Sequence, residues 1–347
     1  MFNNVKLLVL WTTNDCNLRC KYCYAKAGTK KDYMDFETAK RIIETIPNDN
    51  FKIQLAGGEP LLNFSLIENI HDYIRKERPK VKLQMQSNGT LITEKIAKSI
   101  KKMNIAMGIS LDGNIDVNEN LRGKTLDTIN GIKLLGKENV MVNLNCVVTN
   151  KSIDGLDKLV DIAYYLGNVG GIGLDLLRKT GRAIESEVKS ASPNQIKVNL
   201  KKAYNRTVEL SKLTGKRVVI REIEDARKRL EENISTTNYC HATYGGSIVG
   251  LPNGTLYPCG SLVNIEKYFM GNIYKNTSLK TIKINYKNSE MCNRCKYNSI
   301  CIKACPARSI INCKEGSIPI EDCTLRKTAF EIVEEEMEGL CKGDKLF

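Results

Sequence analysis

The sequence predicts an α/β protein whose first half holds a parallel sheet and whose second half is a small cysteine-rich unit. Up to about residue 177, short apolar runs alternate with amphipathic stretches, which indicates strands alternating with helices. From Cys240 onward the chain is rich in Gly, Asn, Pro and Cys, and long periodic runs are few. Alternating strands and helices imply parallel strands joined by right-handed crossovers. Periodicity alone leaves open whether the sheet is an open barrel or doubly wound.

The individual elements follow from apolar spacing and from capping residues. Strands are expected at 6–12, 52–56, 82–87, 106–111, 140–149 and 173–177. Helices are expected between them at 35–43, 65–77, 93–102, 125–136 and 152–166. The later chain predicts charged helices at 193–213 and 221–233, short strands at 247–251 and 255–257, and a final acidic helix at 324–340.

Composition limits the class of protein and its surroundings. Lys and Arg number 53 against 39 Asp and Glu, a formal charge of +14, which favours acidic partners such as nucleic acid, an acidic peptide or a small carboxylate. The same charge also suits a plain solvated surface. No signal peptide and no bilayer-spanning apolar run is visible, so a cytoplasmic protein is expected. Thirteen cysteines in a reducing compartment indicate metal or cluster ligation rather than disulfides.

The first cysteine motif follows the first predicted strand. Cys16, Cys20 and Cys23 are spaced C-x3-C-x2-C. Three thiolates do not complete a four-ligand zinc site. They can hold three irons of a [4Fe–4S] cluster and leave the fourth iron open. This motif resembles that of the radical S-adenosylmethionine (radical SAM) superfamily.

The resemblance extends to the ends of the next predicted strands. It implies that S-adenosylmethionine binds the open iron and is cleaved to a 5′-deoxyadenosyl radical. It also implies a partial (β/α)6 TIM-like barrel over residues 1–177. The implied cofactor-binding residues are Tyr22 near the adenine, Gly57, Gly58, Glu59 and Pro60 at the methionine amino group, Ser87 and Asn88 at the ribose, Ser110 with Arg122 at the carboxylate, and Asp112 in the segment that ends the fourth strand. Sites lie at carboxyl ends of strands in parallel α/β folds.

A second cysteine set lies in the C-terminal third. Its spacing is Cys240-x13-Gly254-x4-Cys259, then Cys292-x2-Cys295-x5-Cys301-x3-Cys305, then x17 to Cys323. It resembles the seven-cysteine pattern of the SPASM domain, which binds auxiliary clusters. The resemblance implies one [4Fe–4S] cluster on Cys292, Cys295, Cys301 and Cys323, and another on Cys240, Cys259 and Cys305. The fourth iron of the cluster on Cys240, Cys259 and Cys305 has no assigned ligand. It is either open or bound by substrate, or it is bound by Cys313, His241 or water. Two zinc sites are the alternative use of such spacing.

With both motifs, the chain divides into a radical SAM barrel (1–177), a helical bridge (178–238), a SPASM domain (239–325) and a C-terminal helix (326–347). The catalytic group is not identified by sequence, and the candidates are Cys146, Cys313 and His241. Sulfatase-maturating relatives carry a catalytic aspartate directly after the second cysteine of the SPASM set. Gly260 stands there in this chain, which argues against the same dehydrogenation by the same base.

The expected function is radical modification of a peptide or protein by cross-linking, oxidation or epimerisation. Three [4Fe–4S] clusters, S-adenosylmethionine and an external flavodoxin- or ferredoxin-type electron donor are expected. The first cluster motif begins at residue 16, so we expect peptide recognition to use a separate protein. The alternatives are radical modification of a tetrapyrrole or other small carboxylate, and, in another class, a zinc-stabilised nucleic-acid-binding protein. No membrane partner is expected, and nucleic acid is not favoured.

Overall fold

The computed structural model describes residues 2–235, 238–275, 279–284, 290–313 and 317–341. These residues form one sheet of ten strands in the order β10-β9-β8-β1-β2-β3-β4-β5-β6-β7. The strands from β8 to β7 in that order are parallel, whereas β9, near one edge, is antiparallel to both of its neighbours, β8 and β10. The strands are β1 (Leu7–Thr13), β2 (Lys52–Gly57), β3 (Lys82–Ser87), β4 (Ala106–Ser110), β5 (Val142–Val148), β6 (Val169–Leu176), β7 (Val219–Ile220), β8 (Ser247–Gly250), β9 (Thr255–Tyr257) and β10 (Gly271–Asn272).

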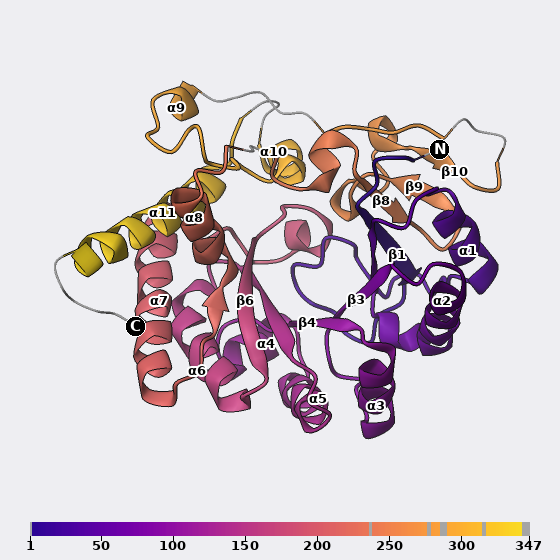
Figure 1. Cartoon of the computed structure of the whole chain (residues 1–347), viewed down its shortest axis with the longest axis horizontal. Coiled ribbons are helices and arrows are strands. Elements are labelled where there is room, and N and C mark those ends of the chain that lie inside the picture. The colour runs from indigo at the N-terminus through magenta and orange to yellow at the C-terminus, as the bar shows by residue number, and fades with distance from the viewer. Residues whose placement is uncertain (1, 236–237, 276–278, 285–289, 314–316, 342–347) are drawn as a thin grey trace.

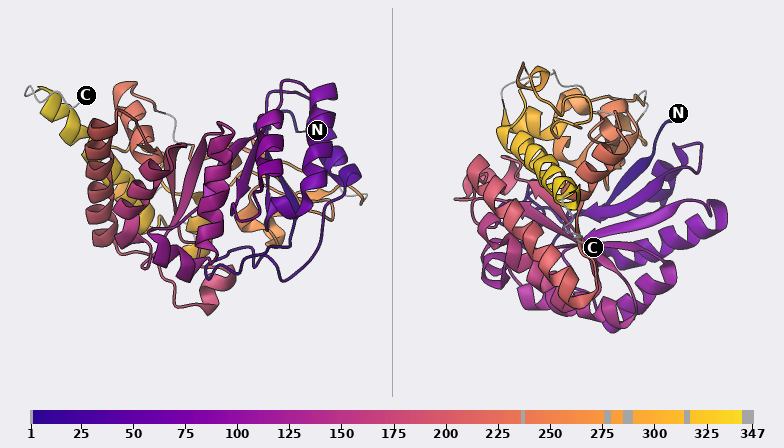
Figure 2. Two further views of the ribbon diagram at one scale, coloured as in Figure 1. Left: turned by 90° about the horizontal axis from the view of Figure 1, so that it is seen from below. Right: turned by 60° about the vertical axis from the view of Figure 1, so that its left-hand side comes forward.

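The helices are α1 (Phe36–Glu44), α2 (Phe64–Glu77), α3 (Glu94–Met103), α4 (Ile115–Leu121), α5 (Thr125–Lys137), α6 (Leu156–Leu166), α7 (Pro193–Thr214), α8 (Arg221–Glu231), α9 (Glu290–Asn293), α10 (Pro306–Asn312) and α11 (Ile320–Cys341). Helices such as α2, α3, α5 and α6 lie on the outer side of a curved sheet, whereas α9 and α10 lie apart from them with the C-terminal segments (Figures 1 and 2). The predicted α/β fold with an open parallel barrel and a cysteine-rich C-terminal region is therefore confirmed.

The alternating pattern of the strands explains why the barrel has an apolar shell and a polar interior. In β2, Ile53 and Leu55 are fully buried against the helices, whereas Gln54 between them is only partly buried. Gln54 accepts a hydrogen bond from Gln84 of β3 (2.8 Å), so neighbouring strands join through side-chain amides on the inner face. Each fully buried Ile or Leu contributes about 1.5–3 kcal/mol to folding. The inner face is left free to line a cavity.

Helix starts follow the capping residues seen in the sequence. Asp35 precedes α1 and accepts a hydrogen bond from the Thr38 backbone N–H (2.7 Å). Thr93 caps α3 in the same way. A cap of this kind stabilises a helix by about 0.5–2 kcal/mol because it satisfies an otherwise unpaired backbone N–H.

The structure differs from the sequence prediction at several elements: β7, β10, α4, α9 and α10 were not expected, and β6 was expected but begins earlier. β7 has two residues, too few to show alternation, and it extends the sheet beyond β6. α4 has seven residues and lies directly after the fourth strand. β6 begins at Val169, earlier than the expected residue 173, because glycines at 170, 171 and 173 hide its pattern.

The C-terminal segments join the same sheet rather than forming a second one. β8 pairs with β1 in parallel, with Leu8 opposite Ile248. α11 packs on α7 and α8, and Arg227 of α8 binds Glu336 of α11 (2.7 Å). The division at residues 177, 238 and 325 stays a prediction, and residues 342–347 of the last segment lie outside the described residues. Within the described chain, every helix is too short or too polar to cross a membrane.

Candidate active site

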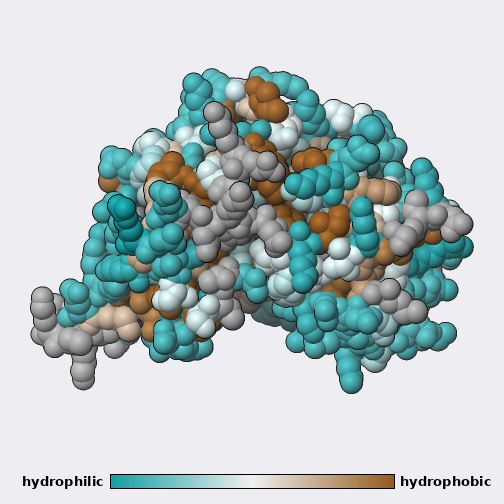
Figure 3. Space-filling model, turned by 90° about the horizontal axis from the view of Figure 1, so that it is seen from above, coloured by the Kyte–Doolittle hydropathy of each residue, from teal (hydrophilic) through white to brown (hydrophobic). Residues whose placement is uncertain are grey.

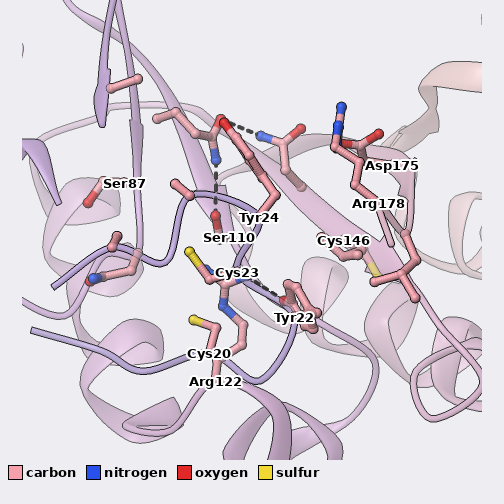
Figure 4. Close-up of a pocket in the computed structure, with 18 of the residues that line it drawn as sticks. Cys20, Tyr22, Cys23, Tyr24, Ser87, Ser110, Arg122, Cys146, Asp175 and Arg178 are labelled. Atoms are coloured by element: carbon pink, nitrogen blue, oxygen red, sulfur yellow. Dashed lines mark hydrogen bonds and ion pairs between the residues drawn. The ribbon is translucent and has the colours of Figure 1, made fainter. Parts of the chain in front are cut away.

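The carboxyl ends of the barrel strands surround one cavity of about 690 Å3, here called the strand-end cavity (Figure 4). It brings together most of the residues that sequence motifs singled out for the cluster and the cofactor. Those that line it are Cys16, Cys20, Cys23, Tyr22, Gly57, Gly58, Ser87, Asn88, Ser110 and Arg122. Segments that follow four different strands, β1 to β4, therefore meet at a single place.

The cysteine loop presents its three thiols to this cavity. The Cys16 Sγ accepts a hydrogen bond from the Leu18 backbone N–H (3.4 Å). Burial, with smaller contributions from Glu59 and from the nearby thiols of Cys20 and Cys23, raises the pKa of the Cys16 thiol to about 11. A bound metal would reverse this effect, because a cation favours the thiolate. Three adjacent thiols on one cavity fit the three cysteine-ligated irons of a [4Fe–4S] cluster.

Two glycines let the end of β2 approach the cysteine loop. A Cβ on Gly58 would lie 1.9 Å from the Asp15 carbonyl oxygen, a distance that side chains do not show. Gly57 has a φ of +126°, and a Cβ there would lie 2.4 Å from the Thr13 oxygen. The close approach is held by backbone hydrogen bonds from Gly58 N–H to Thr13 (2.8 Å) and from Glu59 N–H to Asp15 (2.9 Å). Glycine is thus required for the loop and the strand end to share one wall of the cavity.

Glu59 lies behind this wall and is fully buried. Its carboxylate accepts hydrogen bonds from the Leu61 N–H (3.1 Å), the Ser87 hydroxyl (2.8 Å) and the Asn88 N–H (2.8 Å). Burial raises the pKa of Glu59, although these hydrogen bonds act against it. Glu59 and Pro60 are not among the described residues that line the strand-end cavity. Glu59 instead fixes Ser87 and Asn88, which do line it.

Tyr22, Asp112 and Arg122 form a buried polar group on the cluster side of the cavity. Arg122 donates to the Tyr22 hydroxyl (2.6 Å), and Tyr22 donates to Asp112. The Asp112 carboxylate is fully buried, 3.8 Å from Arg122, and also accepts the Val147 N–H (2.7 Å). Asp112 therefore orients Tyr22 and Arg122 from behind, and the latter two side chains face the cavity.

A row of amides continues along the strands. Gln86 donates to the Ser110 hydroxyl (3.2 Å), and Asn145 donates to Gln86 (2.7 Å). Sequence reasoning singled out Ser110 and missed the two amides, although both occupy inward-facing positions of predicted strands. Sequence reasoning also missed three other residues that line the same cavity: Tyr24, Asp175 and Arg178. Of these, only Asp175 could have been found from the sequence, because it lies near the end of a predicted strand.

The second cysteine set falls into two spatial groups. Burial raises the pKa of Cys323, and a nearby group of three thiols raises it further: Cys292, Cys295 and Cys301. These four cysteines also line one small pocket. Burial likewise raises the pKa of Cys240 to about 11, with added contributions from Cys305 and Cys259. The two groups coincide with the two ligand sets expected from the motif.

Within the described chain, no three His, Cys, Asp or Glu side chains converge on a point that would hold a single metal ion. A four-iron cluster has a different requirement, because each iron takes its own thiolate and the thiols surround a larger volume. The grouping of the cysteines fits the cluster rather than the ion.

The three catalytic candidates are separated in space. Cys146 of β5 is fully buried and lines the strand-end cavity beside Asp112. Cys313 follows α10 and is not among the residues described as lining this cavity. His241 contacts Tyr244 and lies near Lys6 and Lys52, at the opposite ends of their strands from the cavity. The structure therefore brings Cys146 alone of the three to the strand ends.

Comparison with known proteins identifies the class. A model of the radical SAM superfamily matches residues 12–162. An uncharacterized protein of Methanocaldococcus jannaschii is 36% identical over 297 residues, covering 83% of this chain and 95% of that protein. The chain belongs to the radical SAM superfamily, with the cysteine-rich C-terminal region of the SPASM type. Family membership implies a [4Fe–4S] cluster and S-adenosylmethionine.

Characterised relatives are more distant. A cysteine-type anaerobic sulfatase-maturating enzyme of Clostridium perfringens is 26% identical over 334 residues, covering 87% of this chain and 88% of that enzyme. An AdoMet-dependent heme synthase of Nitratidesulfovibrio vulgaris is 27% identical over 331 residues, covering 88% of each. The solved structure of native anSMEcpe with bound AdoMet and Cp18Cys peptide superposes with a TM-score of 0.78 at 23% identity, covering 98% of this chain and 99% of that one. The last similarity shows the fold alone.

Proposed function

We propose that this radical SAM enzyme modifies a peptide or protein by cross-linking, oxidation or epimerisation. The observation that carries the proposal is the strand-end cavity. It holds the cysteine loop and the expected cofactor contacts, and it continues past them to Tyr24, Asp175 and Arg178. A volume of about 690 Å3 leaves room beside a cofactor for part of a substrate. The relatives named for sulfatase maturation and for a bound peptide favour a peptide over other substrates.

In this proposal each side of the cavity has its own task. Cys16, Cys20 and Cys23 hold the cluster, which when bound supplies the electron that cleaves S-adenosylmethionine to a 5′-deoxyadenosyl radical. The backbone of Gly57 and Gly58 lies against the methionine amino group. Glu59 holds the ribose-side residues in place from behind, without contacting the cofactor.

The opposite side of the cofactor is bound by polar side chains. Ser110 and Arg122 bind the carboxylate, and Asp112 keeps Arg122 and Tyr22 oriented. Arg122 is suited to this because its side chain is only 10% exposed, and burial strengthens a charge-assisted hydrogen bond. Cys146, which lines the cavity, is the candidate hydrogen donor to a substrate radical.

The two groups of the second cysteine set are assigned to auxiliary clusters. Cys292, Cys295, Cys301 and Cys323 complete one cluster. Cys240, Cys259 and Cys305 hold the other, whose fourth position is taken by substrate or water. Cys313 and His241 are the alternative fourth ligands of this cluster. An external flavodoxin- or ferredoxin-type donor supplies electrons, and a separate protein presents the peptide.

The test begins with anaerobically purified and reconstituted protein. Three four-iron clusters predict about twelve irons per chain. Reductant and S-adenosylmethionine should yield 5′-deoxyadenosine. Mass spectrometry of peptides encoded beside the gene should then reveal a mass change after turnover. Zinc without iron in protein purified without oxygen would contradict the proposal and favour the nucleic-acid-binding alternative.

The heme synthase relative favours a second candidate, a tetrapyrrole carboxylate substrate. The same turnover assay with a carboxylate-bearing porphyrin separates the two. Loss of carboxyl groups from the porphyrin, with no change in any peptide, would replace the peptide by the tetrapyrrole.

A further inference from the structure

Arg178 projects from the end of β6 into the strand-end cavity with part of its guanidinium unused. Its Nη1 donates to Asp175 (2.5 Å), and its guanidinium lies 5.4 Å from the centre of the Tyr24 ring. Its Nε is buried and has no hydrogen-bond partner among the described residues. A buried N–H of a charged group that makes no hydrogen bond is unfavourable, so such a group calls for a ligand.

The protein itself does not balance the charge at this place. Asp175 is the carboxylate bonded to Arg178, but it also binds Arg308 (2.6 Å). Burial would raise the pKa of Asp175, yet Arg178 and Arg308, with a contribution from Arg221, lower it to about 2. Arg308 is in turn bound to Asp322 (2.5 Å). Arg178 and Arg308 are therefore matched by two carboxylates, but the wall of the cavity as a whole is not balanced. Its lining contains Arg122, Arg178, Arg182, Arg221 and Arg326 against Asp175 and Asp225, an excess of positive charge that favours an anion.

The position of Arg178 suits a substrate rather than the cofactor. Figure 4 shows Arg178 and Asp175 across the pocket from Ser87 and away from Cys20 and Arg122, where the cofactor contacts lie. Tyr24, stacked under Arg178, lies close enough to Cys23 and Cys259 for their charges to affect its pKa. An anion held by Arg178 would therefore sit between the cysteine loop and the second cysteine set.

We propose that the Nε edge of Arg178 binds a carboxylate of the substrate, namely an Asp or Glu side chain of the peptide near the residue that is modified. The Nε and Nη2 edge of a guanidinium makes the two parallel hydrogen bonds that a carboxylate favours. Because Nε is buried in this conformation, the side chain turns this edge toward the cavity when the carboxylate binds. This rests on the proposed function, and it defines an acidic residue as part of what the enzyme selects. The net charge of +14 would assist the approach of such a peptide.

The experiment uses reconstituted holoenzyme and two matched pools of synthetic peptides. One pool contains Asp and Glu, and the other has Asn and Gln at the same positions. We measure two quantities: the rate of 5′-deoxyadenosine formation above that without peptide, and the mass change of each peptide. The acidic pool should be preferred by at least about tenfold, since a charge-assisted bidentate pair exceeds a neutral one by this margin.

Variants assign the preference to one side chain. Arg178→Gln should remove the preference for the acidic pool, and Arg178→Lys should restore part of it. Arg75→Gln, which removes the same charge from an exposed site on α2, should keep it. The peptide-free rate should stay within about twofold of wild type in all three variants. A fall of that rate in Arg178→Gln would mean that Arg178 serves the cofactor, and the inference would be overturned.

The outcomes separate the inference from the proposed function. Equal modification of both pools by wild type and Arg178→Gln would reject the acidic anchor and leave peptide modification standing. Modification of neither pool, with normal 5′-deoxyadenosine formation, would reject peptide modification. Titration calorimetry with glutarate on the same holoenzyme then decides the anion site. Saturable binding that Arg178→Gln abolishes supports it, and no binding by wild type rejects it.

Discussion

The substitution Gly58→Ala tests whether the contact between the end of β2 and the cysteine loop positions the cofactor site. The new methyl group would lie 1.9 Å from the Asp15 carbonyl oxygen, whereas real Cβ atoms essentially never come closer than 3.0 Å. The loop must therefore retreat by about 1 Å. That shift strains the hydrogen bonds from Gly58 to Thr13 and from Glu59 to Asp15. Asp15 directly precedes Cys16, so the first cluster ligand moves with it.

The size of the expected effect follows from two free-energy costs to the fold and from the displacement of the cysteine loop. Overpacking costs about 1–3 kcal/mol, and two weakened hydrogen bonds add about 0.5–1.5 kcal/mol each. A displacement of about 1 Å at a reacting centre lowers rates by about a hundredfold. We therefore expect Gly58→Ala to form 5′-deoxyadenosine about 10–100 times more slowly than wild type while remaining folded.

The assay is 5′-deoxyadenosine formation by reconstituted protein, with iron content and circular dichroism measured on the same samples. Gly339→Ala is the matched control, because nothing lies within 4 Å of a Cβ there and its backbone is helical. Alanine at that position should leave the rate unchanged and raise stability by about 0.5–1 kcal/mol. A rate within twofold of wild type for Gly58→Ala, at normal iron content, would refute the reasoning.

Further predictions concern the clusters and the buried charges. The substitution Arg308→Ala leaves the Asp322 carboxylate buried without its cation and should destabilise the fold by about 3–5 kcal/mol. Anaerobic thermal unfolding measures this loss, and an unchanged midpoint would show that water replaces the arginine as the partner of Asp322. Cys16→Ala should abolish 5′-deoxyadenosine formation, whereas Cys292→Ala should keep part of it and lose the peptide product; identical behaviour would contradict the separate roles of the two cysteine sets. After iron is removed with a chelator, trypsin should cleave residues 290–313 before it cleaves the barrel, because this segment buries few large apolar side chains and depends on the metal for its stability. Simultaneous cleavage of both regions would contradict this expectation.

Surface properties add little to the assignment of function. The face seen in Figure 3 is mostly hydrophilic, with apolar residues gathered in patches near its middle. The side chains that carry the proposed function lie instead inside the strand-end cavity, where several strand ends meet.

Much of the fold was predictable because its signals are local. Strand alternation such as that of Ile53 and Leu55, and caps such as Asp35, depend on neighbours within a few residues. The two-residue strand β7 was missed because a pairing of that length has no periodicity. The pairing of β8 with β1 could not be foreseen, since it joins segments about 240 residues apart through backbone hydrogen bonds that carry no side-chain pattern.

The sequence alone determined the cluster motif, because three thiols in a loop of eight residues must be near one another in any fold. It also determined the superfamily, since ordered motifs at successive strand ends need no coordinates to be recognised. Only the tertiary structure decided which side chains face the strand-end cavity. It showed that Glu59 and Asp112 are buried behind the cavity wall, and that the Nε of Arg178 has no hydrogen-bond partner in the part of the chain that the structure describes. The physical reason is that hydrogen-bond satisfaction and charge balance depend on groups brought together from distant parts of the chain.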